Sequence, residues 1–466
     1  MSDLLLTHGY FLYEDPKEMQ ILKPYVPLGI LYICAHLRAK GFDVDVFDTT
    51  FSSMVELKRH LETETPSVLG VYANLMTRKK VIEILQAAHA AGWRTIVGGP
   101  EPGAYVREYL DAGADFVVLG EGESTTEELL QAMRSGSDTH LHSVAGIAFL
   151  DDAGNVFQTS TRAQIADIDS LHWPARDAVD ICRYVETWRG AHGMGSLSFI
   201  TARGCAYHCR WCSHQVYGKT HRRRKPVKVV DEVEWLLNTY RPDMVWIADD
   251  VFTIHHGWLK AYAAEMRSRG LRIPFECITR ADRLNAEAAD LLAELGCFRV
   301  WIGSESGSQR ILDAMERGVT VGQVQSAVDL CKTRKIQTGM FLMWGYEGEE
   351  LEDIEATIEH VKRTDPDIFF TTVAYPIKGT PYYTQTANSL VQVKPWKESS
   401  DRELQLQGRR SPEFYSYADR LLQNEVQLAR VQRGGANEAA QLELRRQVST
   451  LRKCLHATSS EVKACT

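Results

Sequence analysis

Two long stretches of the sequence alternate short apolar runs with amphipathic segments that are long enough to form helices. The apolar runs are bounded by turn residues, which is typical of buried β-strands separated by helices. This order favours parallel strands, because a parallel connection needs a crossover of about a dozen residues or more. The sequence therefore predicts an α/β fold that begins with a doubly wound, Rossmann-like parallel-sheet domain over residues 1–142.

The second alternation starts at Ser196 and ends near residue 388. It holds six strand-then-helix units, too few for a closed eight-fold barrel. We therefore predict a partial (βα)6, TIM-like barrel over residues 196–388. Residues 143–195 are expected to form a hairpin and an irregular linker, and residues 389–466 a polar, helical C-terminal region.

The overall charge and the lack of long apolar segments argue against a nucleic-acid-binding or membrane-spanning protein. Lys and Arg total 53 against 61 for Asp and Glu, so the net charge of −8 gives no electrostatic reason to expect nucleic acid or an anionic membrane as partner. The N-terminus lacks the basic stretch and cleavage site of a secretory signal, and no segment approaches the roughly 18 apolar residues of a membrane helix. We expect a cytoplasmic protein without a membrane span. The one basic run, residues 219–225, resembles a localisation signal or a phosphate-binding patch. Because it follows the cysteine segment and precedes a helix, we expect a solvated or cluster-flanking loop instead.

Three of the ten cysteines fall within eight positions, as Cys205, Cys209 and Cys212. A disulfide is disfavoured, because the other cysteines are scattered without framework spacing, as in a reducing compartment. A structural zinc would need a fourth ligand, and the nearest candidates are His208 and His214. The third alternative is a [4Fe–4S] cluster held by three thiolates, with one iron left open for another ligand.

The cysteine segment resembles the radical S-adenosylmethionine (SAM) enzymes. Their motif is C-x3-C-x2-C with an aromatic residue before the last cysteine, here Trp211, and Arg203-Gly204 precede it as in that superfamily. The resemblance implies that the three cysteines bind a [4Fe–4S] cluster whose open iron chelates SAM. It also implies an enzyme, which cleaves SAM to a 5′-deoxyadenosyl radical at the expense of one electron from a flavodoxin- or ferredoxin-type reductant.

Motifs at later strand ends resemble the same enzymes. Examples are IGSESG from Ile302, which matches the fourth-strand region, and the GYEGE loop from Gly345, which lacks the proline usual in that family. Taken singly, each acidic residue could equally be a helix N-cap or a loop residue. The resemblance implies that SAM contacts Trp211, Asp249, Asp250, Arg280, Glu305 and Ser306.

The first domain adds a second resemblance, to the cobalamin (B12)-dependent radical SAM enzymes, which include class B methyltransferases and anaerobic porphyrin cyclases. GGPEP and LGEGE close its fourth and fifth strands. The histidine motif of many cobalamin proteins, D-x-H-x-x-G, is missing after the first strand, where Thr7-His8-Gly9 stands. We therefore expect Asn74, Leu75 or Met76 to shield the lower face of the corrin. The resemblance implies cobalamin contacts with Thr49, Tyr72, Asn74, Leu75, Met76, Thr77, Gly98, Gly99, Pro100, Glu121, Gly122 and Glu123.

The family offers two kinds of reaction. The resemblance implies methylation of an unactivated carbon or phosphorus in a small-molecule, natural-product or tetrapyrrole substrate. The alternative is a non-methylating oxidative cyclisation or ring rearrangement, and a more distant one is a SAM- or cobalamin-binding sensor with a structural metal. No residue identifies the substrate. Phe414, Tyr415 and Tyr417 in the C-terminal region either line a pocket or, as aromatic residues on helices usually do, belong to the core.

Overall fold

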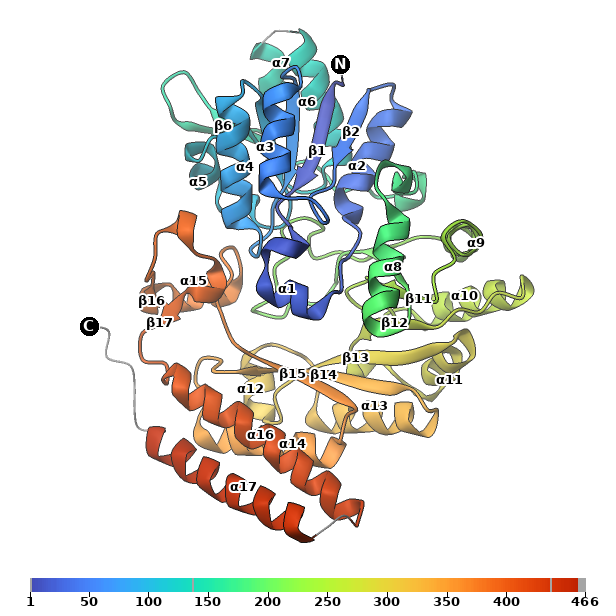
Figure 1. The fold of residues 1–466 in the computed structure, drawn as a ribbon, viewed down its shortest axis with the longest axis vertical. Helices are drawn as coiled ribbons and strands as arrows, with labels where there is room; N and C mark the ends of the chain where they lie inside the picture. Colours follow the sequence, from blue (N-terminus) through green and yellow to red (C-terminus); the bar gives the residue numbers. More distant parts are fainter. Residues whose placement is uncertain (1, 136–137, 436–437, 460–466) are drawn as a thin grey trace. The chain divides into compact units, whose positions relative to one another are not determined.

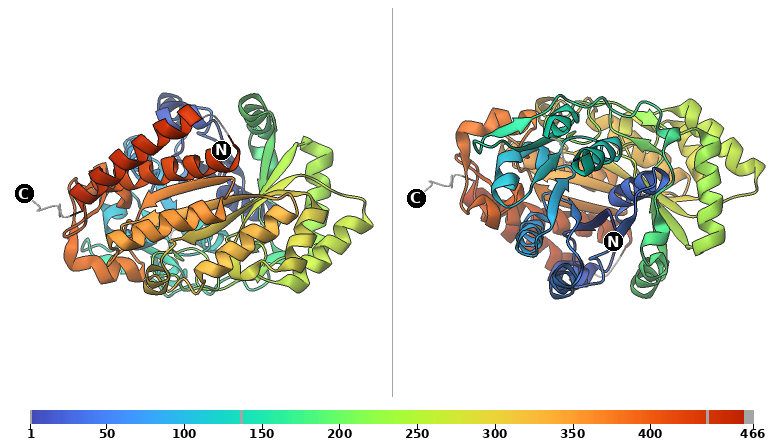
Figure 2. Two further views of the ribbon diagram at one scale, coloured as in Figure 1. Left: turned by 90° about the horizontal axis from the view of Figure 1, so that it is seen from below. Right: turned by 90° about the horizontal axis from the view of Figure 1, so that it is seen from above.

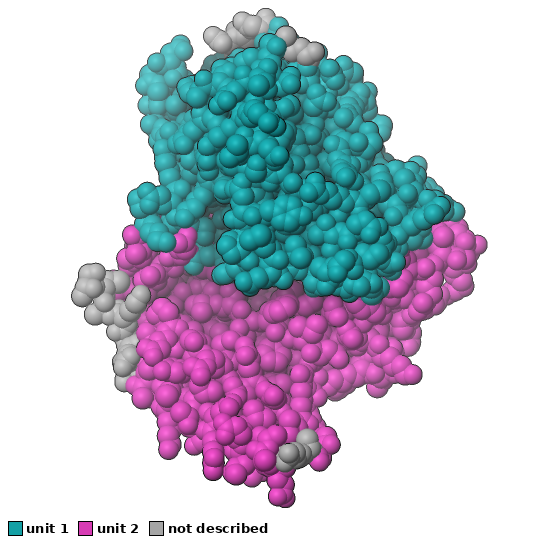
Figure 3. Space-filling model, viewed as in Figure 1, with its two compact units in different colours: residues 1–206, 213–249, 394–402 teal, residues 207–212, 250–393, 403–466 magenta. Residues whose placement is uncertain are grey.

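The computed structural model describes residues 2–135, 138–435 and 438–459. It divides into two compact units (Figure 3). Unit 1 comprises residues 1–206, 213–249 and 394–402, and unit 2 comprises residues 207–212, 250–393 and 403–466. The chain therefore crosses from one unit to the other several times, and each unit is described by itself.

Unit 1 contains a seven-stranded sheet in the order β2-β1-β3-β4-β5-β6-β7. Figure 1 labels β1, β2 and β6 of this sheet. The first five strands are parallel, whereas β6 and β7 form the predicted antiparallel hairpin. This order is that of a doubly wound sheet. The strands are β1 Leu4–His8, β2 Val44–Phe47, β3 Val68–Tyr72, β4 Arg94–Gly98, β5 Phe116–Val118, β6 Ile147–Leu150 and β7 Val156–Gln158.

Helices cover both faces of this sheet, because side chains alternate between the two faces along each strand. On β1, Leu5 packs with residues of α3, α4 and α5, whereas Leu4 and Leu6 pack with residues of α2 and α6. The two apolar layers confirm the predicted Rossmann-like class. The helices are α1 Pro16–Ile21, α2 Leu28–Ala39, α3 Met54–Thr63, α4 Arg78–Ala90, α5 Val106–Asp111, α6 Glu123–Ser135 and α7 Asp138–Ser143.

The rest of unit 1 begins the second alternation. Strands β8 (Ser196–Phe199) and β11 (Met244–Ile247) pair in parallel, and the short strands β9 (Ala202–Arg203) and β10 (Arg222–Arg223) pair antiparallel. Helix α9 spans Pro226–Tyr240. The segment that we expected to be irregular contains a twelve-residue helix, α8 (Ile181–His192), so this part of the prediction is wrong.

Unit 2 continues the alternation with four parallel strands in the order β15-β14-β13-β12. They are β12 Phe275–Thr279, β13 Cys297–Glu305, β14 Gln337–Trp344 and β15 Ile368–Val373. The rings of Phe341 and Phe370 both stack on Trp301 across these strands. All six predicted strands are therefore present. The helices are α10 His256–Ser268, α11 Ala286–Leu295, α12 Gln309–Ala314, α13 Val321–Thr333, α14 Leu351–Thr364 and α15 Pro381–Thr386.

The C-terminal region is less helical than we expected. A small antiparallel pair, β16 (Leu390–Val391) and β17 (Gln405–Leu406), precedes helices α16 (Pro412–Arg433) and α17 (Glu438–Thr458). Helix α16 packs against both α14 and α17, and Figure 2 shows α16 and α17, in red, side by side. Among the residues described, no helix has the length and apolar character that a membrane crossing needs.

A buried ion network fastens residues 394–402 to the first sheet within unit 1. Arg78 at the start of α4 donates from Nη2 to Asp401 Oδ1 at 2.6 Å and from Nε to Glu101 Oε1 at 2.7 Å. Asp401 also accepts from the hydroxyl of Tyr105 at 2.6 Å. The guanidinium of Arg78 lies over the rings of Tyr105 and Trp396. Such a network is costly to break, because each partner is buried away from water.

Candidate functional site

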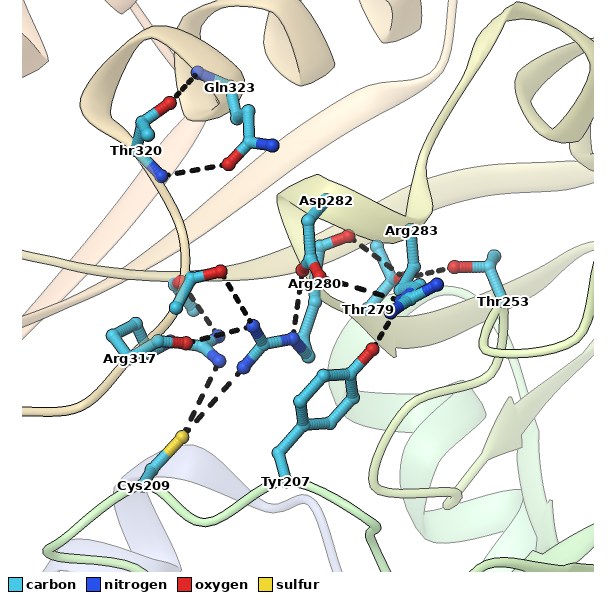
Figure 4. Close-up of polar contacts among 12 residues, drawn as sticks. Tyr207, Cys209, Thr253, Thr279, Arg280, Asp282, Arg283, Arg317, Thr320 and Gln323 are labelled. Atoms are coloured by element: carbon cyan, nitrogen blue, oxygen red, sulfur yellow. Dashed lines mark hydrogen bonds and ion pairs between the residues drawn. The ribbon is translucent and has the colours of Figure 1, made fainter.

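Cys209 lies in the loop of residues 207–212 in unit 2, and its thiol is buried. Its Sγ accepts hydrogen bonds from Nη1 of Arg280 at 3.8 Å and from Nη1 of Arg317 at 3.7 Å (Figure 4). Two cationic donors thus converge on one sulfur. Partners of this kind orient and tune a metal-bound thiolate, so the surroundings of Cys209 suit a cluster ligand.

Hydrogen bonds and an aromatic contact fix the position of the Arg280 guanidinium. Its Nε donates to Asp282 Oδ1 at 2.8 Å, and its Nη2 donates to the carbonyl oxygen of Arg317 at 2.8 Å. The ring of Tyr207 covers it, with 3.6 Å from Cζ to the ring centroid, and Tyr207 also accepts a hydrogen bond from Arg283 (Figure 4). Strand β12 ends at Thr279, the residue before Arg280, so the parallel sheet fixes the backbone from which the Arg280 side chain extends.

Arg317 links Cys209 to Glu305. Its Nη2 donates to the carbonyl oxygen of Gly303 at 3.0 Å, and its Nε lies 3.7 Å from Glu305 Oε1. Burial raises the pKa of the Glu305 carboxyl, and Arg317 and Arg280 oppose this effect. A Cβ atom on Gly303 would lie 2.6 Å from both the Arg317 guanidinium and the Glu305 carboxylate, so a larger residue here would displace the ends of these two side chains.

The loop that carries Cys209 and Cys212 is held by backbone hydrogen bonds on both sides of Arg210. The Arg210 N–H donates to the carbonyl oxygen of Met315 at 3.1 Å, and its own carbonyl oxygen accepts from the Tyr382 N–H at 2.9 Å. The next residue, Trp211, packs against a buried cluster that includes the stacked rings of Tyr346 and Tyr382. The aromatic residue of the motif therefore anchors the loop in the core of unit 2.

Two of the residues predicted to contact SAM are engaged elsewhere. The carboxylate of Asp249, in unit 1, accepts from the backbone N–H of Thr201 at 2.7 Å and from Nη2 of Arg223 at 2.7 Å. The hydroxyl of Ser306 lies 3.1 Å from that of Thr357 on α14. Asp250 is exposed after β11. Of the predicted set, unit 2 brings Arg280 and Glu305 together with Cys209.

The three cysteines of the motif differ in their surroundings. Cys205 is half-buried in unit 1, whereas Cys212 is exposed and Cys209 buried in unit 2. No disulfide joins the nine cysteines that the structure describes. Within the described ranges, no three His, Cys, Asp or Glu side chains converge closely enough to hold one metal ion. A [4Fe–4S] cluster places each thiolate on a different iron, so its ligands stand further apart than those of a single metal ion, and three cysteines suit this group by their chemistry.

The loops predicted to contact cobalamin follow the parallel strands of unit 1. After β3, the side-chain oxygen of Asn74 accepts from the N–H groups of Met76 and Thr77, at 2.9 and 3.1 Å, and so closes the turn. This turn leaves the side chain of Met76 62% exposed and that of Leu75 half-buried. An apolar surface at the carboxyl end of a parallel strand fits a corrin face better than it fits a polar ligand.

The histidine of the first loop is not available as a cobalt ligand. His8 is buried, with its Nε2 at 3.0 Å from Asp48 Oδ1 and its Nδ1 at 3.0 Å from the hydroxyl of Thr49. Thr49 is fully buried, and its hydroxyl also donates to the carbonyl oxygen of His8. Both residues therefore brace the β1 and β2 loops against each other.

The loops after β4 and β5 are also occupied by contacts within unit 1. A Cβ atom on Gly99, where φ is +121°, would lie 2.3 Å from the carbonyl oxygen of Ala73, and Tyr72 flanks the same glycine. The carboxylates of Glu121 and Glu123 pair with Arg203. Pro100 and Gly122 complete these loops and are partly buried.

The basic run at residues 219–225 is not a solvated loop over its arginines. Arg222 pairs with Glu121, Arg223 with Asp249 and Arg224 with Glu232, and these six side chains are between 0% and 11% exposed. That the run also flanks the cluster stays a prediction.

Sequence reasoning did not single out Arg317 and Tyr207, which complete the surroundings of Cys209. Arg317 lies in QRILDAMERGVT, the string after IGSESG that also resembles the fourth-strand region, but the string does not reveal partners that come from β13 and from the cysteine loop. Of the three aromatic residues proposed either for a pocket or for the core, Phe414 and Tyr415 are buried in the core and Tyr417 is half-buried.

Two family models match the chain. Residues 20–130 match the B12 binding domain, and residues 199–361 match the Radical SAM superfamily. The two matches fall on the first sheet of unit 1 and on the second strand–helix alternation. Both resemblances seen in the sequence are thereby confirmed.

Similar proteins include methyltransferases and a cyclase. The chain is 28% identical to an uncharacterized methyltransferase of Pyrococcus horikoshii, over 80% of this chain and 81% of that protein. It is 24% identical to the anaerobic magnesium-protoporphyrin IX monomethyl ester cyclase of Cereibacter sphaeroides, over 78% of this chain and 61% of the cyclase. Its fold is similar to that of the radical SAM methyltransferase TsrM from Kitasatospora setae, solved with cobalamin and a [4Fe–4S] cluster bound. That likeness has a TM-score of 0.68 at 22% identity, over 83% of this chain and 75% of TsrM.

Proposed function

We propose that this chain methylates an unactivated carbon or phosphorus of a small-molecule substrate. It joins a B12 binding domain to a Radical SAM superfamily domain and so belongs to the cobalamin-dependent radical SAM enzymes. When bound, the [4Fe–4S] cluster and SAM would supply a 5′-deoxyadenosyl radical, and cobalamin would supply the methyl group. We assign cobalamin to residues 1–142, and the cluster and SAM to residues 196–388.

The observation that carries this proposal is the convergence of Arg280 and Arg317 on the sulfur of Cys209. In this role the two guanidinium groups donate N–H hydrogen bonds to a thiolate and offset its negative charge. Arg280 and Glu305 are also our proposed contacts for SAM, and both contact Arg317. One set of charged groups would thus serve both the cluster and the SAM that binds it.

In unit 1, we propose that Leu75 and Met76 cover the lower face of the corrin. Met76 is exposed and Leu75 half-buried after β3, which supports this role. The engagement of His8 with Asp48 and Thr49 leaves no histidine for the cobalt in that loop. An apolar cover would exclude water and polar ligands from the cobalt.

Methylation is supported by the names of the Pyrococcus relative and of TsrM. The likeness to the anaerobic cyclase supports a second candidate, in which the same cofactors carry out a non-methylating oxidative cyclisation. Either reaction needs an external electron for SAM cleavage, and we propose a flavodoxin- or ferredoxin-type protein as its source.

The first experiment tests for the cluster. Anaerobic reconstitution with iron and sulfide is expected to give a brown protein with about four irons per chain, which forms 5′-deoxyadenosine from SAM under dithionite. Replacing Cys205, Cys209 or Cys212 by Ser should abolish both properties. Cys182, which is exposed on α8, supplies the matched control, and Cys182→Ser should retain them. Stoichiometric zinc in place of iron would contradict the proposal.

The second experiment separates methylation from cyclisation. Deuteromethyl-SAM and hydroxocobalamin are added to the reduced enzyme with candidate substrates, and the products are analysed by mass spectrometry. A labelled methyl group in the product supports methylation. Labelled methyl that reaches cobalamin but never a substrate, together with loss of hydrogen from the substrate, would favour cyclisation.

A further inference from the structure

A buried ion network in unit 1 joins the loop after β5 to the residues that lead into the cysteine motif. Arg203 donates from Nη1 to Glu121 Oε1 at 2.8 Å and from Nη2 to Glu123 Oε1 at 2.6 Å. The second oxygen of Glu121 accepts from Nη1 of Arg222 at 2.6 Å. The side chains of Arg203, Glu121 and Glu123 are each about 3–4% exposed. Charged groups this deeply buried persist only when they are paired, and here each carboxylate faces at least one guanidinium.

The guanidinium of Arg203 is also enclosed by two aromatic rings. Its Cζ lies 4.9 Å from the ring centroid of Tyr32 on α2 and 5.3 Å from that of Tyr217. Because a guanidinium is always charged in proteins, Arg203 needs the two carboxylates as partners. The carboxylates and the two rings together fix the position and orientation of its planar group.

The backbone around Arg203 is equally constrained. Arg203 pairs with Arg222 in the two-stranded sheet of β9 and β10. At the next residue, Gly204, φ is +82°, and a Cβ atom would lie 2.2 Å from the carbonyl oxygen of Thr220. Only glycine fits this position without moving the β10 side of the sheet. Cys205 follows directly, so its backbone starts from two immobilised residues.

The other end of the same short strand is held by Asp249. Its carboxylate accepts from the N–H groups of Thr201 and Ala202, at 2.7 and 3.1 Å, and pairs with Arg223 on β10. Two sets of carboxylates therefore hold the β9 and β10 pair, namely Asp249 and the two glutamates. The glutamates belong to the domain that matches the B12 binding model.

We propose that Glu121 and Glu123 are positioning residues for the cluster. The two carboxylates hold Arg203 and, through it, fix the position of Cys205. This inference rests on the proposed function, because it takes Cys205 as a cluster ligand. The carboxylates are thus committed to the cysteine strand, and any cobalamin contact in this loop falls to its backbone. The loop after β5 would then contribute to the binding of both cofactors. The cobalamin-binding domain would thus help to position Cys205 as a cluster ligand.

The test compares Glu123→Gln and Arg203→Lys with the wild type. Glu123→Gln keeps the size of the side chain but removes its charge, and Arg203→Lys keeps the charge but loses the two-pronged geometry. Asp401→Asn is the matched control, because it weakens an equally buried ion network in the same unit away from the cysteines. Each reconstituted protein is measured for iron loss to a chelator, for the EPR spectrum of the dithionite-reduced cluster, and for hydroxocobalamin affinity by absorbance.

For Glu123→Gln we expect iron loss about tenfold faster than in the wild type and altered EPR g-values, with unchanged cobalamin affinity. Arg203→Lys should fall between this variant and the wild type. Asp401→Asn should lower the melting temperature and leave the EPR spectrum unchanged. Wild-type iron retention and EPR spectrum in Glu123→Gln, or a loss of cobalamin affinity alone, would overturn the positioning role. A wild-type protein that assembles no cluster would overturn the proposed function itself.

Discussion

Nη1 of Arg317 lies 3.7 Å from Sγ of Cys209, although 108 residues separate the two in the sequence. The contact is possible because Arg317 follows strand β13 and helix α12, whose carboxyl-end loop faces the loop of Cys209 in unit 2. A backbone hydrogen bond from Arg210 N–H to the carbonyl oxygen of Met315 holds the same two segments together. The thiol thus meets a charged donor that no local pattern could have placed beside it.

Replacing Arg317 by Gln should impair the cluster without unfolding the protein. The variant loses a charged N–H donor to the Cys209 sulfur and a partner of Glu305. We expect the rate of 5′-deoxyadenosine formation under dithionite to fall about 10- to 100-fold, with a changed midpoint potential in an EPR-monitored titration. Arg267→Gln, at an exposed arginine of α10, is the control and should behave as the wild type. An unchanged potential in Arg317→Gln would show that this contact does not act on the cluster.

Asn74→Ala should weaken cobalamin binding. The substitution removes the acceptor of two backbone hydrogen bonds that shape the turn carrying Leu75 and Met76, at a cost of about 1 kcal/mol. If that cost appears in binding, the cobalamin dissociation constant rises about fivefold, which an absorbance titration measures. Asn285→Ala serves as the control, because it removes a comparable cap at the start of α11 in unit 2. Equal affinities in the two variants would argue against a role for the β3 turn.

Gly99→Ala should destabilise the protein more than Gly41→Ala. Both glycines have positive φ, +121° and +81°, so each alanine adds conformational strain of about 1 kcal/mol or more. The strain is larger at Gly99, because its φ lies further from the left-handed region. Gly41 has no atom within 4 Å of a new Cβ, whereas at Gly99 the carbonyl oxygen of Ala73 is 2.3 Å away. Denaturant unfolding should therefore show a clearly larger loss for Gly99→Ala than for Gly41→Ala, by about 2 kcal/mol or more. Similar losses would mean that the loops after β3 and β4 separate easily.

The stability of the protein should fall in mild acid because of His360. This residue is buried on α14, and burial lowers its pKa to about 4, with a further contribution from Arg363. A proton therefore binds the unfolded state more readily than the folded state. The contribution of His360 to the free energy of unfolding is fully present above about pH 6.5. It is lost as the pH falls towards 4, by roughly 3 kcal/mol over that range.

Unfolding curves at pH 7.5 and pH 5 provide the measurement. The wild type should lose about 2 kcal/mol from this residue between the two values. In His360→Gln, which has no titrating group there, that part of the loss should disappear even if the variant is less stable overall. A wild type and a variant with the same pH dependence would contradict the prediction.

The sequence predicted the two α/β parts well, because strand and helix periods are local properties of the chain. The five parallel strands of the first sheet, its hairpin and all six later strands were found in this way. Helix α8 was missed, although Asp180 caps its start and Gly193 ends it in a left-handed conformation. Its apolar residues Tyr184, Val185 and Trp188 are spaced among polar ones, and the glycine-rich end suggested a linker.

The candidate site was predicted less completely, because its contacts are set by packing. The cysteine spacing and Arg280 were visible in the motifs. The partners of Asp249, Glu121 and Glu123 were not, since each carboxylate pairs with an arginine distant in sequence. A motif identifies the type of residue at a strand end, but the fold decides whether its side chain meets a ligand or another part of the protein.

The ion network around Arg78 bears on how this enzyme can be divided. Asp401 belongs to a stretch of nine residues that lies within unit 1, although the chain on both sides of it lies within unit 2. A fragment that ends after the first sheet would keep Arg78 and Glu101 but lose Asp401 and the ring of Trp396. Such a fragment would expose a surface with a partly paired arginine at its centre. The cobalamin-binding part of this enzyme is therefore not a detachable module, and exchanging it between relatives would require the exchange of residues 394–402 as well.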